Sequence, residues 1–197
     1  MELKAIEFPY NTEVISEEAF KAHIILYKGY VSTVNNTDSD FKDGEPKTGR
    51  SKASMLKGMK HDSQYSLNGI ILHEEYFRNM TKKKCVPGEK TVKLIEKCFG
   101  TMEKFVSCFT EAAAAAKGWC VLAYEQRSGD LRILLLDLHD TGVVFMACPL
   151  LVLDMYEHAY YLDYKTDKKK YIETFMNNIN WDIVEMRADY VYSHAMK

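Results

Sequence analysis

The sequence predicts an α+β protein, in which an N-terminal α-helical hairpin domain is followed by a mixed domain with a three-stranded antiparallel sheet and helices. Two observations support this fold class. Apolar residues recur at helical spacing over roughly the first 80 positions. After residue 118 come three short apolar runs, and a turn signal separates the first two, as in strands. A polar linker divides the two patterns, so we expect domains at residues 1–84 and 89–197.

In the N-terminal domain we expect two helices separated by a long polar segment. Ser16 followed by two glutamates predicts the start of a helix. A serine side chain can accept hydrogen bonds from the free N–H groups of the first turn, and acidic side chains interact favourably with the positive N-terminal end of the helix dipole. The segment after this helix is rich in Asn, Asp, Lys and Gly, which predicts a mobile surface excursion. The expected elements are an extended arm over residues 1–12, a helix from Ser16 to about Val34, the excursion over 35–64 with a short helix near 54–60, and a helix over 66–80.

The C-terminal domain begins after a solvated linker that contains Lys82–Lys84 and Pro87-Gly88. Five consecutive alanines, the best helix former, end the second of two expected helices. Arg127–Asp130 is a turn signal between two apolar runs and predicts a hairpin of strands. The expected elements are helices over 91–99 and 102–116, strands over 119–124, 131–136 and 150–154, and closing helices over 167–178 and 181–192.

The composition excludes several classes of partner. The chain has 197 residues, with 26 basic and 28 acidic side chains and a formal charge of -2, which suggests neither a nucleic-acid nor a membrane partner. No apolar run reaches the roughly 20 residues that cross a bilayer, and the N-terminus has no apolar signal core, so we expect a cytoplasmic protein. Five scattered cysteines without a Cys-x-x-Cys pair indicate free thiols in a reducing compartment.

The most informative motif follows the last expected strand. The apolar run Pro149–Leu153 ends in Asp154, and a charge at the end of a buried strand needs a partner or a metal ion. If one helical turn follows, the side chains of Asp154 and His158 project together. A carboxylate with an imidazole suits manganese, iron or zinc. The spacing Asp-x-x-x-His alone, however, favours an ordinary strand-end carboxylate paired with a nearby histidine or lysine.

The wider string changes this interpretation. It is Asp154-Met155-Tyr156-Glu157-His158-Ala159-Tyr160-Tyr161, and it resembles Asp-x-Trp-Glu-His-Ala-Tyr-Tyr, the signature of the iron/manganese superoxide dismutases. The resemblance covers nearly the whole chain in order and spacing. It includes the segments Ile15–His23, Gly29–Val31, Leu67–Phe77, Gly118-Trp119 and Asn180-Trp181. It implies an antioxidant enzyme, a superoxide dismutase that converts superoxide to oxygen and hydrogen peroxide.

The same resemblance implies a metal site. By their places in the family's motifs, one Fe or Mn ion per subunit would be bound by His23, His73, Asp154 and His158, with a solvent molecule as fifth ligand. Three imidazoles and one carboxylate suit redox-active iron or manganese, whereas zinc would be inert. We expect iron first, with manganese close behind and use of both metals as an alternative. Gly69 matches manganese members of the family, but Val152 is bulkier than the glycine common in them.

Tyr30 and His139 are the catalytic residues that the resemblance implies, with Tyr30 gating the substrate channel and relaying protons. Tyr30 lies seven positions after His23, whereas relatives usually have eight; seven fits an unbroken helix, so we infer that this chain has lost a π-bulge. Gly69 and His139 form a linked pair, since manganese members have a glycine and an inward-reaching glutamine at these two positions. His139 would donate a hydrogen bond to the metal-bound solvent and tune its pKa.

The resemblance also implies a homodimer, with a tetramer as the larger alternative. Glu157 would reach the partner subunit's His158, and Tyr161 would form a matching contact with Tyr27. Tyr156 stands where the family has tryptophan, and Tyr27 with the following lysine replaces its usual His-His pair. These departures leave two alternatives open, namely a metal-binding dimer of the same fold without dismutase activity and an iron enzyme that acts on an organic substrate.

Overall fold

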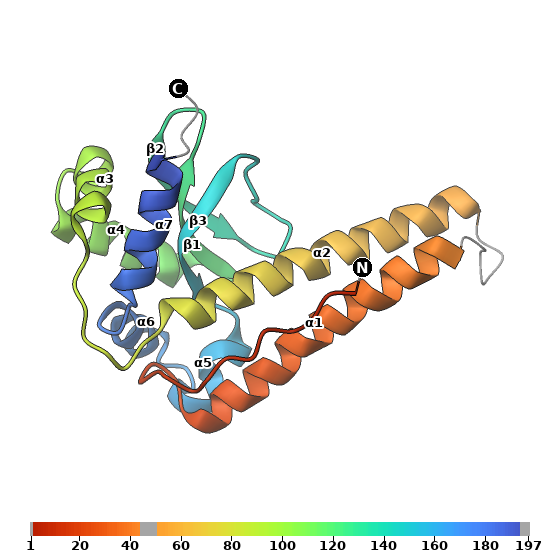
Figure 1. Cartoon of the computed structure of the whole chain (residues 1–197). Helices are drawn as coiled ribbons and strands as arrows, with labels where there is room; N and C mark the ends of the chain where they lie inside the picture. Colours follow the sequence, from red (N-terminus) through yellow and green to blue (C-terminus); the bar gives the residue numbers. More distant parts are fainter. Residues whose placement is uncertain (1, 44–50, 194–197) are drawn as a thin grey trace.

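Two long antiparallel helices form a hairpin that projects from a mixed part of helices and strands (Figure 1). The computed structural model describes residues 2–43 and 51–193. Within them, α1 spans Glu17–Asp43 and α2 spans Lys52–Asn79. The extended arm before α1 runs back along the hairpin. There the Leu3 N–H donates to Oδ1 of Asn35 at 2.8 Å, and the Asn35 amide N–H donates to the Leu3 carbonyl oxygen at 2.9 Å. The predicted N-terminal helical hairpin is therefore confirmed.

Both helices of the hairpin are longer than the sequence predicted. The expected excursion over 35–64, with its short separate helix, is wrong for its described part, because α1 continues to Asp43 and α2 already begins at Lys52. Polar residues predict exposure rather than a break in a helix, and this end of the hairpin projects away from the sheet in Figure 1. The sequence Asp43-Gly44-Glu45-Pro46 predicts a turn, of which only Asp43, the last residue of α1, belongs to the described residues.

The mixed part contains a three-stranded antiparallel sheet, as predicted, with the strand order β2-β1-β3. Its elements are α3 (Glu89–Phe99), α4 (Met102–Ala115), β1 (Trp119–Glu125), β2 (Asp130–Leu136), β3 (Ala147–Asp154), α5 (Glu157–Tyr164), α6 (Lys168–Met176) and α7 (Trp181–Ser193). The sequence predicted no more than one helical turn after Asp154, because the short helix α5 buries few side chains and so shows a weak apolar period. None of the helices in the described part of the chain has the length and hydrophobicity needed to span a membrane.

The central strand β1 forms the core of the sheet, since every residue from Trp119 to Tyr124 is buried. Helix α4 contributes Phe105 and Phe109 to the same core, and neither has any exposed surface. The antiparallel register of β1 with β3 pairs Trp119 with Asp154. The large buried indole therefore lies beside the charged end of β3.

The end of α2 is fastened to β3 by polar side chains. The Val152 N–H donates to Oδ1 of Asn79 at 2.9 Å, and the Asn79 amide donates to the Leu150 carbonyl oxygen at 3.4 Å. Arg187 of α7 donates to the same carbonyl oxygen at 2.7 Å and to Asn79 Oδ1 at 3.2 Å. These bonds satisfy backbone groups of an edge strand that would otherwise be buried without partners. They fix the hairpin relative to the strand that ends in Asp154.

Asn79→Ala should lower the free energy of unfolding by about 1–3 kcal/mol, because it leaves the buried Val152 N–H without an acceptor. Urea denaturation of the metal-free protein measures this difference. Asn35→Ala is the matched control, since it removes two backbone contacts at an exposed position and should cost less. Equal losses of unfolding free energy in the two variants would contradict a stabilising role for the hydrogen bonds between Asn79 and β3.

Candidate metal centre

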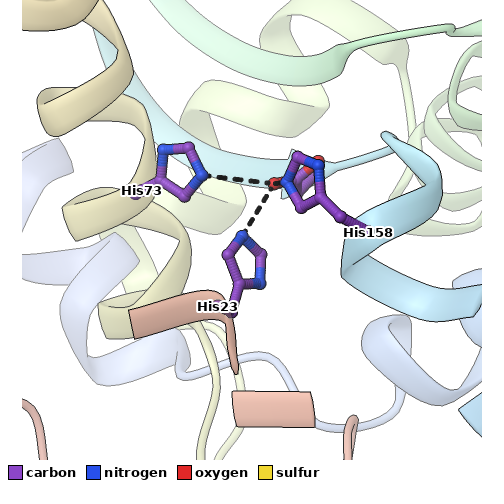
Figure 2. Close-up of side chains that lie close together, drawn as sticks. His23, His73 and His158 are labelled. Carbon is purple, nitrogen blue, oxygen red and sulfur yellow. Dashed lines mark hydrogen bonds and ion pairs between the residues drawn. The ribbon is translucent and has the colours of Figure 1, made fainter. Parts of the chain in front are cut away.

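Four side chains from four separate elements meet between the hairpin and the sheet. His23 comes from α1, His73 from α2, Asp154 from the end of β3, and His158 from the first turn of α5. One ligand atom from each lies within 4.8 Å of the others, and Figure 2 shows the three histidines converging. The first three residues are buried, whereas the His158 side chain is 35% exposed. The structure thus brings together the four residues that the sequence singled out.

The carboxylate of Asp154 is the centre of this group. Its Oδ2 atom lies 3.1 Å from Nε2 of His23, 3.2 Å from Nε2 of His158 and 3.8 Å from Nε2 of His73. The other carboxylate oxygen accepts a hydrogen bond from the Tyr156 backbone N–H at 2.9 Å. Aspartate side chains commonly accept a hydrogen bond from the backbone N–H two residues later, and such a bond stabilises a turn. Here the turn connects β3 to α5 and places His158 beside Asp154.

His73 presents a free lone pair to the group. Its Nδ1–H donates to the Gly69 carbonyl oxygen at 2.6 Å, which fixes the ring proton on Nδ1. The Nε2 atom of His73 is therefore an acceptor, and it is buried without a hydrogen-bond partner among the described residues. A buried polar atom without a partner costs free energy, whereas a cation between the imidazoles and the carboxylate would satisfy it. The residues present thus fit a metal ion.

Burial governs the protonation of this group. It lowers the pKa of the His73 imidazole to about 3 and also lowers the pKa of His23, so both rings are neutral near pH 7. Burial by itself raises the pKa of Asp154, but hydrogen bonds from His158 and His23 outweigh it and hold that pKa below its ordinary value. The group therefore offers one carboxylate and several imidazole lone pairs, a donor set suited to iron, manganese or zinc.

Gly69 and His139 are matched in space, as their pairing in the sequence predicted. A Cβ atom at Gly69 would lie 3.0 Å from Cδ2 of His139 and 3.3 Å from Cγ of Tyr30. A larger residue at position 69 would have to displace one of these rings in a closely packed region. Helix α1 is an unbroken α-helix through Tyr30, in agreement with the predicted loss of the bulge.

A chain of hydrogen bonds connects Trp119, His139 and Tyr30. The Trp119 Nε1–H donates to Nδ1 of His139 at 2.9 Å, and Nε2 of His139 lies 2.8 Å from the Tyr30 hydroxyl oxygen. Because an indole can only donate, Nδ1 must be an acceptor. Burial lowers the pKa of His139 to about 4, so the neutral ring carries its one proton on Nε2 and donates it to Tyr30. The proton that we expected to reach a metal-bound solvent is therefore directed to the Tyr30 hydroxyl.

Trp119 and Tyr65 belong to this site, although the sequence left both without a role. A buried tryptophan needs an acceptor for its N–H, and this requirement is the signal that could have pointed to a partner such as His139. The Tyr65 ring lies 4.5 Å from the His139 ring, centroid to centroid. Tyr65, Gly69 and His73 follow one another at spacings of four on α2, so they share one helix face. That spacing could have identified Tyr65.

Tyr156 also packs against His139. The two ring centroids lie 5.6 Å apart, and the Tyr156 hydroxyl donates to the Asp137 carbonyl oxygen at 3.2 Å. Its ring also stacks on His158 at 5.3 Å with an interplanar angle of 14°. Tyr156 therefore contacts both His139 and the candidate ligand His158, and its hydroxyl donates to the backbone rather than to the metal group.

One predicted subunit contact does not agree with the structure. Tyr27 has no exposed surface, since its hydroxyl accepts from the Ile6 N–H at 2.8 Å and donates to Glu74 at 2.7 Å. It cannot touch a second subunit, so the predicted contact between Tyr161 and Tyr27 is wrong. The reason is that the N-terminal arm covers α1 at this point. Tyr161, in contrast, is 50% exposed on α5, and Glu157 on the same helix is exposed as well.

The hairpin supplies two histidines, the sheet supplies a carboxylate and α5 supplies the third histidine. This arrangement is that of proteins with a mononuclear metal centre of three histidines and one carboxylate. The family model described as "Iron/manganese superoxide dismutases, C-terminal domain" matches residues 87–187. The chain belongs to the iron/manganese superoxide dismutase family, as the resemblance of its motifs indicated.

Relatives support this membership over nearly the full length. The chain is 37% identical to Superoxide dismutase (Fe) of Aquifex pyrophilus, over 96% of this chain and 89% of that protein. It is 33% identical to Superoxide dismutase (Mn/Fe) of Aeropyrum pernix, over 98% of this chain and 93% of that protein. Similarity to proteins named for either metal agrees with a site that could hold iron or manganese.

The buried histidines generate a prediction about pH. His73 and His139 have pKa values of about 3 and about 4 in the folded protein, below the ordinary value of 6.5. Below that value the unfolded chain takes up protons that the folded, metal-free protein does not, so stability is lost as the pH falls from about 6.5 towards 4. Each such histidine contributes a slope of at most about 1.4 kcal/mol per pH unit. Urea denaturation of the metal-free protein across this range measures the slope.

His139→Gln removes one of these histidines and should flatten the dependence of unfolding free energy on pH. His61→Gln is the matched control, because the His61 side chain is 67% exposed. If the unfolding free energies of His139→Gln and the wild type depend on pH with the same slope, then the pKa of His139 is the same in the folded and unfolded states.

Proposed function

We propose that this protein is a superoxide dismutase, an antioxidant enzyme that converts two superoxide ions and two protons to one oxygen and one hydrogen peroxide. The observation that carries the proposal is the convergence within 4.8 Å of His23, His73, Asp154 and His158 in a member of this family. Proteins of 33% and 37% identity to this chain are named as dismutases of iron or of manganese and iron. Nothing in the described part of the chain favours a metal-binding protein without dismutase activity.

One Fe or Mn ion per subunit would be held by imidazole nitrogens of the three histidines and by the carboxylate of Asp154. The bound ion supplies a one-electron couple between the trivalent and divalent states, which serves to oxidise one superoxide and to reduce the next. Asp154 adds a negative charge that favours the higher oxidation state, while the neutral imidazoles add none. Iron is the metal we favour, with manganese, or use of both, as the alternative.

Tyr30 and His139 would act together in proton supply. His139 donates through Nε2 to the Tyr30 hydroxyl oxygen, so the Tyr30 proton itself remains free to point elsewhere. The Tyr30 ring lies 5.4 Å from the ring of His73, which places this hydroxyl-bearing side chain against the candidate ligands. Burial raises the pKa of Tyr30 to about 12, so the Tyr30 hydroxyl stays protonated near pH 7 and can donate a hydrogen bond. Trp119 acts as a positioning residue, because it sets the tautomer of His139.

Superoxide consumption by the protein loaded separately with iron and with manganese tests this function. We expect dismutation with at least one metal, and we expect His158→Ala to lose most of its metal and its activity, because one of four protein ligands is gone. Elemental analysis gives the metal content. His61→Ala is the control, since it removes an exposed histidine outside the four-residue group and should leave metal content and activity unchanged.

Two results would count against the assignment. Full metal occupancy of His158→Ala would remove His158 from the ligand set. A wild-type protein that is fully loaded with either metal, yet does not consume superoxide, would favour the alternative of a metal-binding protein without dismutase activity.

We also propose a homodimer formed through α5. His158 is 35% exposed although it belongs to an otherwise buried metal group, so one side of the centre is open in the isolated chain. Glu157 and Tyr161 are exposed on the same helix. A second subunit on α5 would cover the opening, and the carboxylate of Glu157 would orient the partner subunit's His158 by accepting a hydrogen bond from its ring N–H.

Glu157→Ala should weaken this dimer, with a rise in its dissociation constant of roughly tenfold or more, and should speed the loss of metal. Sedimentation velocity at several protein concentrations measures the first effect, and metal release to a chelator measures the second. Glu173→Ala on α6 is the matched control, because that carboxylate is also exposed but lies on another helix. A wild-type monomer with full activity would rule out the bridge.

We further propose that residues 1–84 and 89–197 are separate domains and that the protein is cytoplasmic. The segment between α2 and α3 forms no helix or sheet strand beyond an isolated bridge at Met80, which supports a linker there. All five cysteines are free thiols, as suits a reducing compartment.

A further inference from the structure

A groove runs along one face of α2, between this helix, the edge strand β3 and α7, and the three elements pack on one another (Figure 1). It consists of two adjoining hollows of about 450 Å³ and about 230 Å³, which share the lining residues Ile71 and Pro149. Clefts that bind small molecules have volumes of roughly 300–1,000 Å³. None of the four candidate metal ligands lines either hollow. We call the two hollows together the α2 groove.

A row of α2 residues lines the whole α2 groove. Its members follow one another at spacings of three or four, so they share one face of the helix. They are Asn68, Ile71, Glu75 and Arg78. At the usual rise per residue of an α-helix, the row from the first to the last of them is about 15 Å long. The groove is therefore elongated, and an extended chain matches it better than a compact ligand does.

One end of the α2 groove carries charged side chains. Among the described residues that line the 450 Å³ hollow are two guanidinium groups, Arg78 and Arg187, and one carboxylate, Glu75. Nη1 of Arg78 donates to Oε1 of Glu75 at 2.7 Å, and Arg187 forms an ion pair with the other oxygen. Glu74, which is 3.6 Å from Arg78, accepts a hydrogen bond from Tyr27 and does not line the hollow. The lining thus has a net positive charge, which favours an anion.

Arg78 is the group that an anion in this hollow can reach. Its side chain is 33% exposed, and its Nη2 lies 3.6 Å from Glu74, beyond hydrogen-bonding distance. A carboxylate can accept two parallel hydrogen bonds from one guanidinium. The Arg187 side chain is only 11% exposed, and burial lowers its pKa to about 10, so it remains charged near pH 7. Arg78 therefore offers the contact, and Arg187 adds a fixed positive charge to the same wall.

The other end of the α2 groove is apolar. Val121, Leu134 and Val144 help to form the 230 Å³ hollow, and none of the described residues that line it is acidic, lysine or arginine. Apolar cavities of about 150 Å³ admit a benzene molecule, so this hollow has room for a hydrocarbon segment, whereas a charge there would be costly. His139 also lines it, so an occupant would lie against the ring that is hydrogen-bonded to Tyr30.

The edge of β3 does not suit a peptide strand as the occupant. Pro149 has no N–H group, and the Leu150 carbonyl oxygen already accepts from Asn79 and Arg187. The Val152 N–H donates to the same asparagine. A peptide that extends a sheet needs free N–H and C=O groups on the edge strand. At these positions β3 offers the groove apolar side chains instead, which is the surface that a hydrocarbon chain requires.

We propose that the α2 groove binds a fatty-acid-type ligand, a single hydrocarbon chain with one terminal carboxylate. The carboxylate pairs with Arg78, and the chain passes Ile71 and Pro149 into the 230 Å³ hollow. The proposal rests on the net positive charge at one end of an elongated groove and the apolar hollow at the other. The end of the chain then lies against His139, which connects the groove to the hydrogen bonds of that ring with Trp119 and Tyr30.

Isothermal titration calorimetry of the full-length, metal-loaded protein with dodecanoate, below the concentration at which it forms micelles, tests this proposal. We expect a single dodecanoate to bind per chain. Octanoate should have a dissociation constant at least roughly tenfold higher, because its shorter chain buries fewer methylene groups. Dodecyltrimethylammonium has the same chain with a cationic headgroup, and it should also bind at least roughly tenfold more weakly, because its charge repels the guanidinium groups.

Two variants change the lining of the α2 groove. Arg78→Gln removes the partner of the carboxylate, and Ile71→Glu puts a negative charge beside the hydrocarbon chain; Ile71 is 43% exposed, so the fold tolerates a glutamate there. Each should raise the dissociation constant of dodecanoate at least roughly tenfold. Arg132→Gln and Val86→Glu are the matched controls, because both side chains are exposed and lie outside the groove, and they should leave this constant unchanged.

Alkylation of the cysteines locates the ligand in the wild-type protein. Cys148 lines the 450 Å³ hollow, so saturating dodecanoate should slow its reaction with iodoacetamide at least roughly tenfold. Cys108 is exposed on α4 outside the groove and is the internal control, whose reaction rate should not change. Mass spectrometry of the digested protein measures both rates.

Three results would each overturn the proposal. The first is no binding of dodecanoate to the wild-type protein, and the second is equal binding of dodecanoate and dodecyltrimethylammonium. The third is binding of dodecanoate that neither Arg78→Gln nor Ile71→Glu weakens and that leaves the alkylation rate of Cys148 unchanged. None of these measurements involves superoxide, so their outcome is independent of the proposed dismutase activity.

Discussion

The rest of the structure depends on one buried carboxylate. Asp154 ends β3 with no exposed surface, and a buried charge of this kind costs several kcal/mol unless it is paired. Its partners come from α1, α2 and α5, so the carboxylate draws together the hairpin, the sheet and the helix that follows. The hydrogen bonds of Asn79 to β3 and the turn that Tyr156 closes on Asp154 hold these parts in the required places.

The identity of residue 139 constrains what surrounds the metal group. A neutral imidazole has one donor and one acceptor, and Trp119 already occupies the acceptor of His139. The remaining N–H meets the Tyr30 hydroxyl, so the ring has nothing left for another partner. Tyr30 is consequently the group through which His139 can influence the centre. The glycine at position 69 makes this possible, because any Cβ there would crowd both rings.

Features that depend on the spacing of nearby residues could be predicted from the sequence. Features that depend on contacts between distant segments could not. The strand that ends in Asp154 and the return of His158 one turn later follow from a few adjacent residues, as does the unbroken helix from His23 to Tyr30. The length of the hairpin was missed because polar composition does not distinguish an exposed helix from an exposed loop. The burial of Tyr27 was missed because it depends on where the N-terminal arm lies, which is a tertiary contact without a local signal.

The separation of the four candidate ligands along the chain has its own consequence. His23 and His73 are 50 positions apart, and His73 and Asp154 are 81 apart. An ion bound to all of them would act as a cross-link that closes two long loops. In the simplest treatment, closing one loop of this length lowers the conformational entropy of the unfolded chain by an amount worth about 4 kcal/mol. Because three of the four ligands are buried and all four come from separate elements, release of the ion would break the link between the hairpin and the sheet. The metal present when the chain folds would then exchange slowly, so supply during synthesis would weigh on which metal the protein carries.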